Sequence, residues 1–246
     1  MPSSGLADTV RNATNRGALP LYFLRVSRLH PDEFSVNLNR SMEAAASPFP
    51  SAEEKRSARE AKRAAVLRAA VQMFNERGFH QTSLDDVAAR LGISKPTIYH
   101  YLGNKDQVLL ECVSIGLGQL IEAAEQSRVR EGTGADRLIA FLVRFAEVNM
   151  DDFGRCVIRT GDEALAPESR KRFRALKRQI DSDMRGLISA AVDDGSIPPC
   201  DVRLMAFTLA GALNWPARWH DHGGAMTPQQ IARQMVDILA RGFLPR

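Results

Sequence analysis

Apolar side chains recur every three to four residues along most of the chain from residue 53 to residue 241, which is the period of an amphipathic α-helix. No segment shows the period of two that marks a half-buried strand, and there is no internal repeat. The pattern therefore predicts an all-α fold with helices at 53–78, 84–91, 95–102, 105–126, 134–150, 153–160, 167–195, 202–220 and 227–241.

Residues with known capping roles support these bounds. Ser83 and Ser94 stand directly before the two shortest early helices, and Asn104 with Gln107 has the spacing of a capping box. Pro96 falls in a first helical turn, where a missing N–H costs nothing, whereas Pro216 is expected to kink the helix that contains it.

The first predicted helix carries its apolar positions at spacings of two to four residues. Phe74 and Val71 lie near its end, and alanines supply most of the remaining predicted buried face. The full set is Ala58, Ala61, Ala65, Leu67, Ala69, Val71 and Phe74.

Residues 1–52 show neither helical nor strand periodicity, and Ser, Asn, Arg and Pro are scattered through them. We predict a disordered extension. Met42 is a second candidate start, so the sequence leaves open whether residues 1–41 belong to the native protein. An alternative is a basic arm that reaches DNA, although acidic residues offset its arginines.

The two short helices, 84–91 and 95–102, are separated by a tight turn containing Gly92, which is the pattern of a helix-turn-helix unit. The second helix is anchored mainly by Ile98, with Leu102, and its remaining side chains are too polar for a core. Its other face is therefore free to enter a major groove. Short helices bounded by glycine also occur in many all-α proteins, so spacing alone leaves a purely structural alternative open.

Net charge and cysteine content indicate what kind of partner and what cellular compartment to expect. A formal net charge of +4 and a pI near 9.2 are compatible with a polyanionic partner. The three cysteines are far apart, which argues against a disulfide framework or a zinc site and fits a reducing cytoplasm. The longest mostly apolar run, 204–215, is too short to cross a bilayer, so we expect no membrane partner.

The early helices carry a family resemblance. Ala70, Phe74, Gly78 and Phe79, followed by "TSLDDVAARLGISKPTIYHYLGNKDQVL", closely resemble the DNA-binding region of TetR-type (TetR/AcrR) transcriptional regulators over residues 59–110. The resemblance implies a homodimeric, ligand-responsive regulator, most often a repressor, on a palindromic double-stranded operator. It also implies an N-terminal three-helix DNA-binding domain, 53–103, and a C-terminal helical domain, 104–246, for effector binding and dimerisation.

The resemblance also implies roles for single residues. Lys95, Pro96, Thr97 and Tyr99 fall where the family contacts base edges and the adjacent backbone; Ser83, Tyr101 and Lys105 fall where it contacts phosphates. The chemistry agrees, because a lysine donates to guanine O6 and N7, and a threonine methyl contacts the thymine methyl. His100 departs from the family at a position where an aromatic ring is frequent, and "LGNK" replaces the commoner "F-x-S/N-K".

The C-terminal segment "NWPARWHDHGG", with the helix that follows it, is similar to the ends of TetR-type regulators that respond to acyl-CoA esters. This similarity, over 204–245, implies dimerisation through the last two helices and an acyl-CoA or related acid as effector. Candidate effector contacts are the rings and polar groups of Phe141, Phe145, Phe173, Phe207, Arg155, Arg159, Arg218, Asn214 and Trp215. Plain core packing and solvated arginines are the alternative for each of them.

The same similarity predicts an apolar dimer stripe on the last two helices. Its candidates are Leu204, Leu209, Ala212 and Leu213 on one helix and Ile231, Met235, Ile238 and Leu239 on the other.

An enzymatic function finds little support in the sequence. The adjacent carboxylates, such as Asp151 with Asp152, stand at helix ends and are interpreted as caps, since neighbouring helical residues do not face each other. His220 and His222 lie in one loop without a predictable third ligand, so we expect no metal and no cofactor. An effector-independent architectural DNA-binding protein is the remaining alternative. The sequence does not give the operator, the effector or the sign of regulation.

Overall fold

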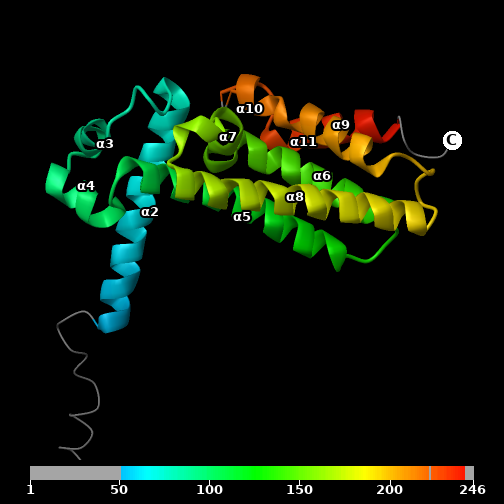
Figure 1. The fold of residues 1–246 in the computed structure, drawn as a ribbon, viewed down its shortest axis with the longest axis horizontal. Helices are drawn as coiled ribbons and strands as arrows, with labels where there is room; N and C mark the ends of the chain where they lie inside the picture. Colours follow the sequence, from blue (N-terminus) through cyan, green and yellow to red (C-terminus); the bar gives the residue numbers. More distant parts are fainter. Residues whose placement is uncertain (1–50, 222, 242–246) are drawn as a thin grey trace, which may run out of the picture. The chain divides into compact units, whose positions relative to one another are not determined.

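The computed structural model describes residues 51–221 and 223–241, so the predicted disordered extension, 1–52, lies outside the described residues apart from its last two positions. Within these ranges there is no strand, and the predicted all-α class is confirmed (Figure 1). The helices are α2 (Ala52–Arg77), α3 (Leu84–Leu91), α4 (Lys95–Leu102), α5 (Lys105–Arg128), α6 (Gly134–Met150), α7 (Asp152–Arg159), the short 3-10 turn η1 (Asp162–Ala164), α8 (Pro167–Asp193), α9 (Val202–Asn214), α10 (Pro216–Trp219) and α11 (Pro228–Arg241).

The predicted caps start the helices as expected. The Ser83 hydroxyl accepts a hydrogen bond from the Asp86 amide at 3.1 Å, and the Asn104 side chain accepts one from the Gln107 amide at 2.9 Å. In both cases the third helical residue returns a hydrogen bond to the cap, which completes the capping box. The caps could be predicted from the sequence because each capping hydrogen bond joins residues only three positions apart.

Two expected helix features differ from the structure. The predicted helix 202–220 is divided at Pro216, because proline cannot donate the next helical hydrogen bond: α9 ends at Asn214, α10 starts at Pro216, and Trp215 between them keeps right-handed helical backbone angles. The predicted buried face of the first helix is also too long. Ala58, Ala61 and Ala65 are exposed, and burial in α2 begins at Val66.

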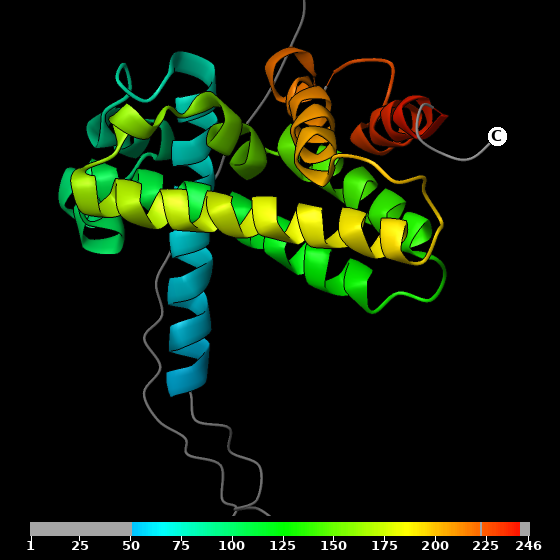
Figure 2. The same ribbon diagram turned by 45° about the vertical axis from the view of Figure 1, so that its right-hand side comes forward.

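The remaining helices pack around α5 (Figures 1 and 2). Helices α6, α7 and α8 all lie against it, while α2, α3 and α4 form a three-helix cluster at its N-terminal end, and α9 and α11 pack on α6. By length and composition alone, α5 is apolar enough to span a membrane, but half of that apolar window is buried inside the protein, as expected for a core helix. A single core joins buried side chains from Val66 to Val236, so the expected domain boundary at 103/104 stays a prediction.

Helix α7 crosses α5 at close range because α5 has a glycine, Gly116, at the crossing. A Cβ atom on Gly116 of α5 would lie 2.6 Å from the carbonyl oxygen of Phe153, well inside van der Waals contact. A Cβ atom on Gly154 of α7 would in turn meet the Val148 carbonyl oxygen of α6, so Gly116 and Gly154 let α7 lie close to α5 and to α6, respectively.

We expect Gly116→Ala to destabilise the fold by about 1–3 kcal/mol, because the added methyl group must push α7 away from α5. Gly118, two residues on in the same helix, is exposed and has nothing within 4 Å of its Cβ position. Gly118→Ala should instead stabilise by up to about 1 kcal/mol through helix propensity. Urea unfolding of both variants measures the difference; equal effects would contradict the close crossing.

Candidate nucleic-acid interface and ligand cavity

Helix α4 is held to the protein by one narrow face. Ile98 is fully buried and Leu102 nearly so, and both pack into the core shared with α2 and α3. On the other side Lys95, Tyr99 and His100 are exposed, with half of the Tyr99 side chain open to solvent. An eight-residue helix with this division presents its polar side chains outward on a rigid support.

Two of the outward side chains are already oriented. The Lys95 ammonium lies 2.6 Å from the Asp85 carboxylate of α3, and this hydrogen bond raises the pKa of the lysine. The Thr97 hydroxyl is 2.7 Å from that of Ser94, the cap of α4. Lys95 is thus paired with Asp85 on the other side of the turn. To bind a base, the lysine would have to leave the Asp85 carboxylate or donate to the base and the carboxylate at the same time.

Lys105 lies at the start of α5, next to the helix-turn-helix. Its ammonium sits 4.2 Å above the Phe79 ring and 3.5 Å from the His80 carbonyl oxygen, and partial burial lowers its pKa. The Ser83 hydroxyl donates to Asp86 at 2.6 Å, which lowers the pKa of that carboxyl. Lys105 is thus a positioned cation, whereas the hydroxyl of Ser83 is engaged in its own cap.

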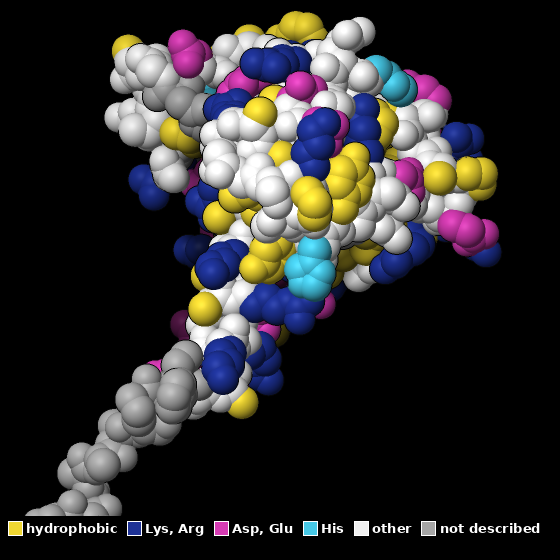
Figure 3. All heavy atoms as spheres, turned by 90° about the vertical axis from the view of Figure 1, so that its left-hand side faces the viewer, with side chains coloured by type: hydrophobic (Ala, Val, Ile, Leu, Met, Phe, Trp, Pro, Cys, Tyr) yellow, Lys and Arg dark blue, Asp and Glu magenta, His cyan; other side chains and the backbone are white. Residues whose placement is uncertain are grey.

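The face on which α3 and α4 lie is shown in Figure 3. Lys and Arg side chains are spread over it and gather along the part of α2 that projects beyond the three-helix cluster. Seven of the eight predicted DNA-contacting residues belong to the segment from the cap of α3 through α4, and Lys105 follows it directly. The arrangement suits contact with a long polyanion rather than catalysis.

A separate apolar cavity of about 230 Å³ lies among the helices that follow. Its walls come from α5, α6, α7, α8 and α9 and it is open to solvent on one side; of the predicted effector residues Phe145, Phe207 and Asn214 line it. Two small side chains, Ala206 and Ala210, form part of the α9 wall. A cavity bounded by so many separate helices is typical of a small-molecule site.

The polar groups of this cavity include three that the sequence interpretation missed. Asn149 is fully buried; its amide nitrogen donates to the Asn214 side-chain oxygen at 2.9 Å, and its own Oδ1 has no hydrogen-bond partner among the described residues. Lys177 and Asp181 of α8 stand at the rim. A single asparagine on an otherwise apolar stretch of α6 was the available signal for this site.

The other predicted effector residues lie elsewhere. Phe141 and Phe173 are fully buried in the core and do not line the cavity, and Trp215 is 61% exposed. Arg155 donates to the His220 carbonyl oxygen at 3.0 Å, and burial lowers the pKa of its guanidinium. Arg159 donates to the Asn75 carbonyl oxygen at 2.7 Å.

Arg159 and Arg155 therefore form hydrogen bonds that connect α7 to other segments of the chain. Arg159 joins the end of α2 to α7 and also donates to the Ala217 and Arg218 carbonyl oxygens at 3.3 Å. With Arg218 it borders a surface hollow near the end of α2, away from the apolar cavity.

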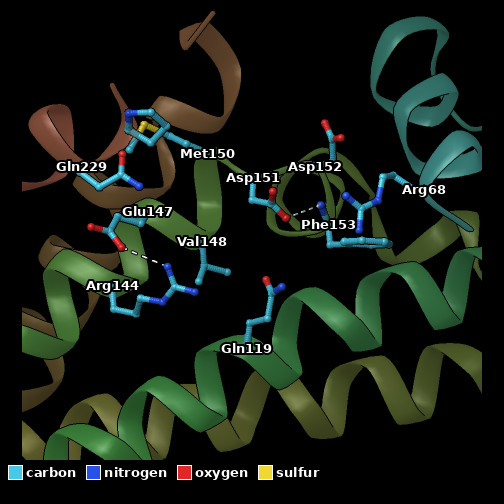
Figure 4. Close-up of a pocket in the computed structure, with 11 residues that line it drawn as sticks. Arg68, Gln119, Arg144, Glu147, Val148, Met150, Asp151, Asp152, Phe153 and Gln229 are labelled. Carbon is cyan, nitrogen blue, oxygen red and sulfur yellow. Dashed lines mark hydrogen bonds and ion pairs between the residues drawn. The ribbon is translucent and has the colours of Figure 1, made fainter. Parts of the chain in front are cut away.

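A second hollow, of about 460 Å³, is mostly polar (Figure 4). Arg68, Gln119 and Asp151 border it, and Arg144 is paired with Glu147 at 3.0 Å. It contains none of the predicted effector residues. Among the described residues, no three His, Cys, Asp or Glu side chains are grouped as metal ligands would be.

Large apolar side chains are exposed on the last helices. Leu204 of α9 is 63% exposed, Trp215 directly after α9 is 61% exposed, and Ile238 of α11 is 69% exposed. Of the predicted dimer stripe, however, Leu209, Leu213 and Ile231 are buried within their own protomer's core. Leu204 and Ile238 are therefore its most exposed large members.

A helix-turn-helix joined to a larger helical unit is the arrangement of a DNA-binding regulator. Residues 66–112 match the family described as "Bacterial regulatory proteins, tetR family", and residues 131–243 match "Tetracyclin repressor-like, C-terminal domain". The regulator EthR of Mycolicibacterium smegmatis is 31% identical in an alignment of 187 positions that covers 71% of this chain and 82% of EthR. The chain belongs to the TetR family of transcriptional regulators.

Further similarities agree with this assignment. The repressor KstR2 of Rhodococcus jostii is 28% identical over 76% of this chain and 93% of its own. The crystal structure of PfmR from Thermus thermophilus superposes with a TM-score of 0.67 at 30% identity, covering 74% of this chain and 99% of PfmR. AibR, solved with isovaleryl coenzyme A and operator DNA, has the same fold, with a TM-score of 0.63 at 24% identity over 72% of this chain and 96% of AibR. The expected TetR-type identity is thus confirmed, and the chain is a DNA-binding regulator rather than an enzyme.

Proposed function

We propose that the protein is a repressor that binds a palindromic operator as a homodimer and is released by a small-molecule effector with an acyl chain, such as an acyl-CoA or a related acid. The observation that carries the DNA-binding part is the division of α4 into a buried face around Ile98 and an exposed face with Lys95, Tyr99 and His100. On this proposal α4 enters the major groove, where its N-terminal side chains reach base edges. The protein then acts in the cytoplasm, where its operator lies.

The proposed contacts divide into two kinds. Lys95, Pro96, Thr97, Tyr99 and His100 would face bases and the adjacent backbone, and Ser83, Tyr101 and Lys105 would contact phosphates. Ser83 contributes through the N-terminus of α3, whose free N–H groups attract an anion, because its hydroxyl is already bonded to Asp86. Phosphate contacts position the protein, and base contacts select the sequence.

The proposed effector site is the apolar cavity among α5 to α9. Its volume of about 230 Å³ fits an acyl chain of modest length, and it is too small for a complete acyl-CoA. The unpaired Oδ1 of Asn149 could accept a hydrogen bond from an N–H or O–H group that enters the cavity. Lys177 at the rim is paired with Asp162 at 2.5 Å, and a carboxylate or phosphate of an acid or acyl-CoA held at the rim would share or replace that partner. The complex of AibR with isovaleryl coenzyme A and operator DNA supports this class of ligand, because AibR has the same fold.

Release from DNA would follow from different affinities of the effector for two conformations. Helix α7 supplies Val157 and Ile158 to the cavity wall and is tied to α2 through Arg159 and Asn75. A ligand that displaces α7 therefore shifts the helix that carries the DNA-binding cluster.

We expect Lys105→Ala to weaken binding to every duplex, and Lys95→Ala to reduce mainly the preference for the operator, by about 1–3 kcal/mol. The reason is that Lys105 is placed for a phosphate and Lys95 for a base edge. Titration of operator and scrambled duplexes over a range of salt concentrations measures both effects. If Lys95→Ala lowers the affinity for both duplexes equally, its assignment to a base is wrong.

A further inference from the structure

Helix α2 extends well beyond the cluster that it helps to form. Every side chain from Ala52 to Lys62 is exposed, and burial starts only at Val66. At about 1.5 Å per residue, the segment from Lys55 to Arg63 is about 12 Å long. The projecting segment is visible as the lower part of α2 in Figures 1 and 2.

The charges on this segment are separated around the helix. Lys55, Arg59 and Lys62 are spaced four and three residues apart, so they share one face. Among the described residues none of the three takes part in an ion pair. Arg56, by contrast, is paired with Glu53 at 2.8 Å and with Glu60 at 3.9 Å on another side of the helix.

The face that carries the three cations continues into the buried face of α2. The same spacing along the helix leads to Val66, Ala70 and Met73, which are all buried in the protein core. Next to this face, Arg63 bonds the Tyr101 carbonyl oxygen at the end of α4 at 3.3 Å and pairs with Glu111 of α5. The cations thus begin at the C-terminal end of α4 and continue outward on its side of α2.

We propose that Lys55, Arg59 and Lys62 form an arm that binds backbone phosphates of the duplex flanking the half-site read by α4. The inference rests on the proposed DNA-binding function and adds a second binding surface to it. The occupant is double-stranded DNA because three unpaired cations in a row, about 10 Å along a rigid helix, complement a phosphate backbone and offer no large apolar area for a protein. This length is close to the width of one major groove, about 12 Å, so the three cations can follow phosphates along the edge of a groove.

The test uses the full-length chain and a duplex selected by it from a random-sequence library. Binding is titrated at several salt concentrations on the minimal duplex and on one extended by about ten base pairs, one helical turn, at each end. The variant is Lys55→Ala/Arg59→Ala/Lys62→Ala. The matched control, Arg130→Ala/Arg172→Ala/Arg178→Ala, removes three exposed cations that lie outside α2 to α4.

We expect the wild type to bind the extended duplex at least about tenfold more tightly than the minimal one, and the arm variant to bind both duplexes with similar affinity. The slope of log affinity against log salt should flatten by about 0.9 for each phosphate that the variant no longer binds. Lys55→Arg/Lys62→Arg should retain the tighter binding to the extended duplex, and the control should behave as wild type.

An arm variant that still binds the extended duplex more tightly, as the wild type does, overturns the proposal. So does a weakening of equal size on both duplexes, or one matched by the control, since either would reflect overall charge. Helix content by circular dichroism checks that the variant is folded. If the wild type selects no duplex at all, it is the proposed DNA-binding function that fails.

Discussion

Replacing Ile238 with glutamate should convert the protein to monomers that retain their helical content but bind the operator at least about a hundredfold more weakly. Ile238 is 69% exposed on α11, a helix that packs beside α9 with its own exposed apolar side chains. If this surface is the dimer interface, the substitution buries an unpaired carboxylate there, which costs about 3–5 kcal/mol. Two recognition helices read adjacent major grooves only when a dimer holds them about 34–36 Å apart.

Ile238 is a better position for the charge than Met235, because a charge at Ile238 tests the dimer without disturbing the monomer. Met235, another member of the predicted stripe, is half-buried against its own protomer's core, so a charge there would also damage the monomer. Ile238 avoids this, because its side chain contributes little to the isolated fold. Val129, 85% exposed directly after α5, offers a matched control, and Val129→Glu should remain dimeric.

Sedimentation and tryptophan fluorescence measure the outcome. The chain has two tryptophans, Trp215 and Trp219, and both are exposed in the protomer on the proposed interface. Their emission should shift to longer wavelength when the dimer separates. A variant that sediments as a dimer of wild-type affinity would place the interface elsewhere.

The elements of the DNA-binding region could be predicted because their determinants are local. Ser83, Ser94 and Asn104 each cap the helix that follows them, and Ile98 anchors α4 by its position on the buried side. Each of these outcomes depends on residues three or four positions apart. The extent of burial in α2 was less predictable, because alanines fit an exposed helix as well as a buried one.

The ligand cavity could be predicted only in part, because it arises from the packing of five helices. Phe145, Phe207 and Asn214 line it, whereas Phe141 and Phe173 lie on similar apolar faces and fill the core. Arginines misled the interpretation most clearly. Arg155 and Arg159 are suitable anion ligands by chemistry, yet each already donates a hydrogen bond to a carbonyl oxygen of a distant segment.

Filling the cavity should separate DNA binding from effector response. Ala210 lies on the α9 wall and is half-buried, so in Ala210→Phe the ring would project into the space of about 230 Å³. Release is proposed to require displacement of α7, whereas the ring would project from α9 into existing space. We therefore expect α7 to stay in place and the variant to bind the operator as the wild type does; a loss of operator binding would mean that the ring acts as the effector does. It should no longer be released by effector.

A panel of free and CoA-linked acyl chains of increasing length provides the measurement, with thermal unfolding and operator release as two readouts. A ligand present at about 100 times its Kd stabilises the wild type by about 2.7 kcal/mol, a rise in Tm of about 5–10 °C for a chain of this size. Ala210→Phe should show no such rise, while Val129→Phe, at the exposed end of α5, should respond fully. If Ala210→Phe still shows the full Tm shift, the ligand binds elsewhere, and the polar hollow beside Arg68 and Gln119 becomes the site to test.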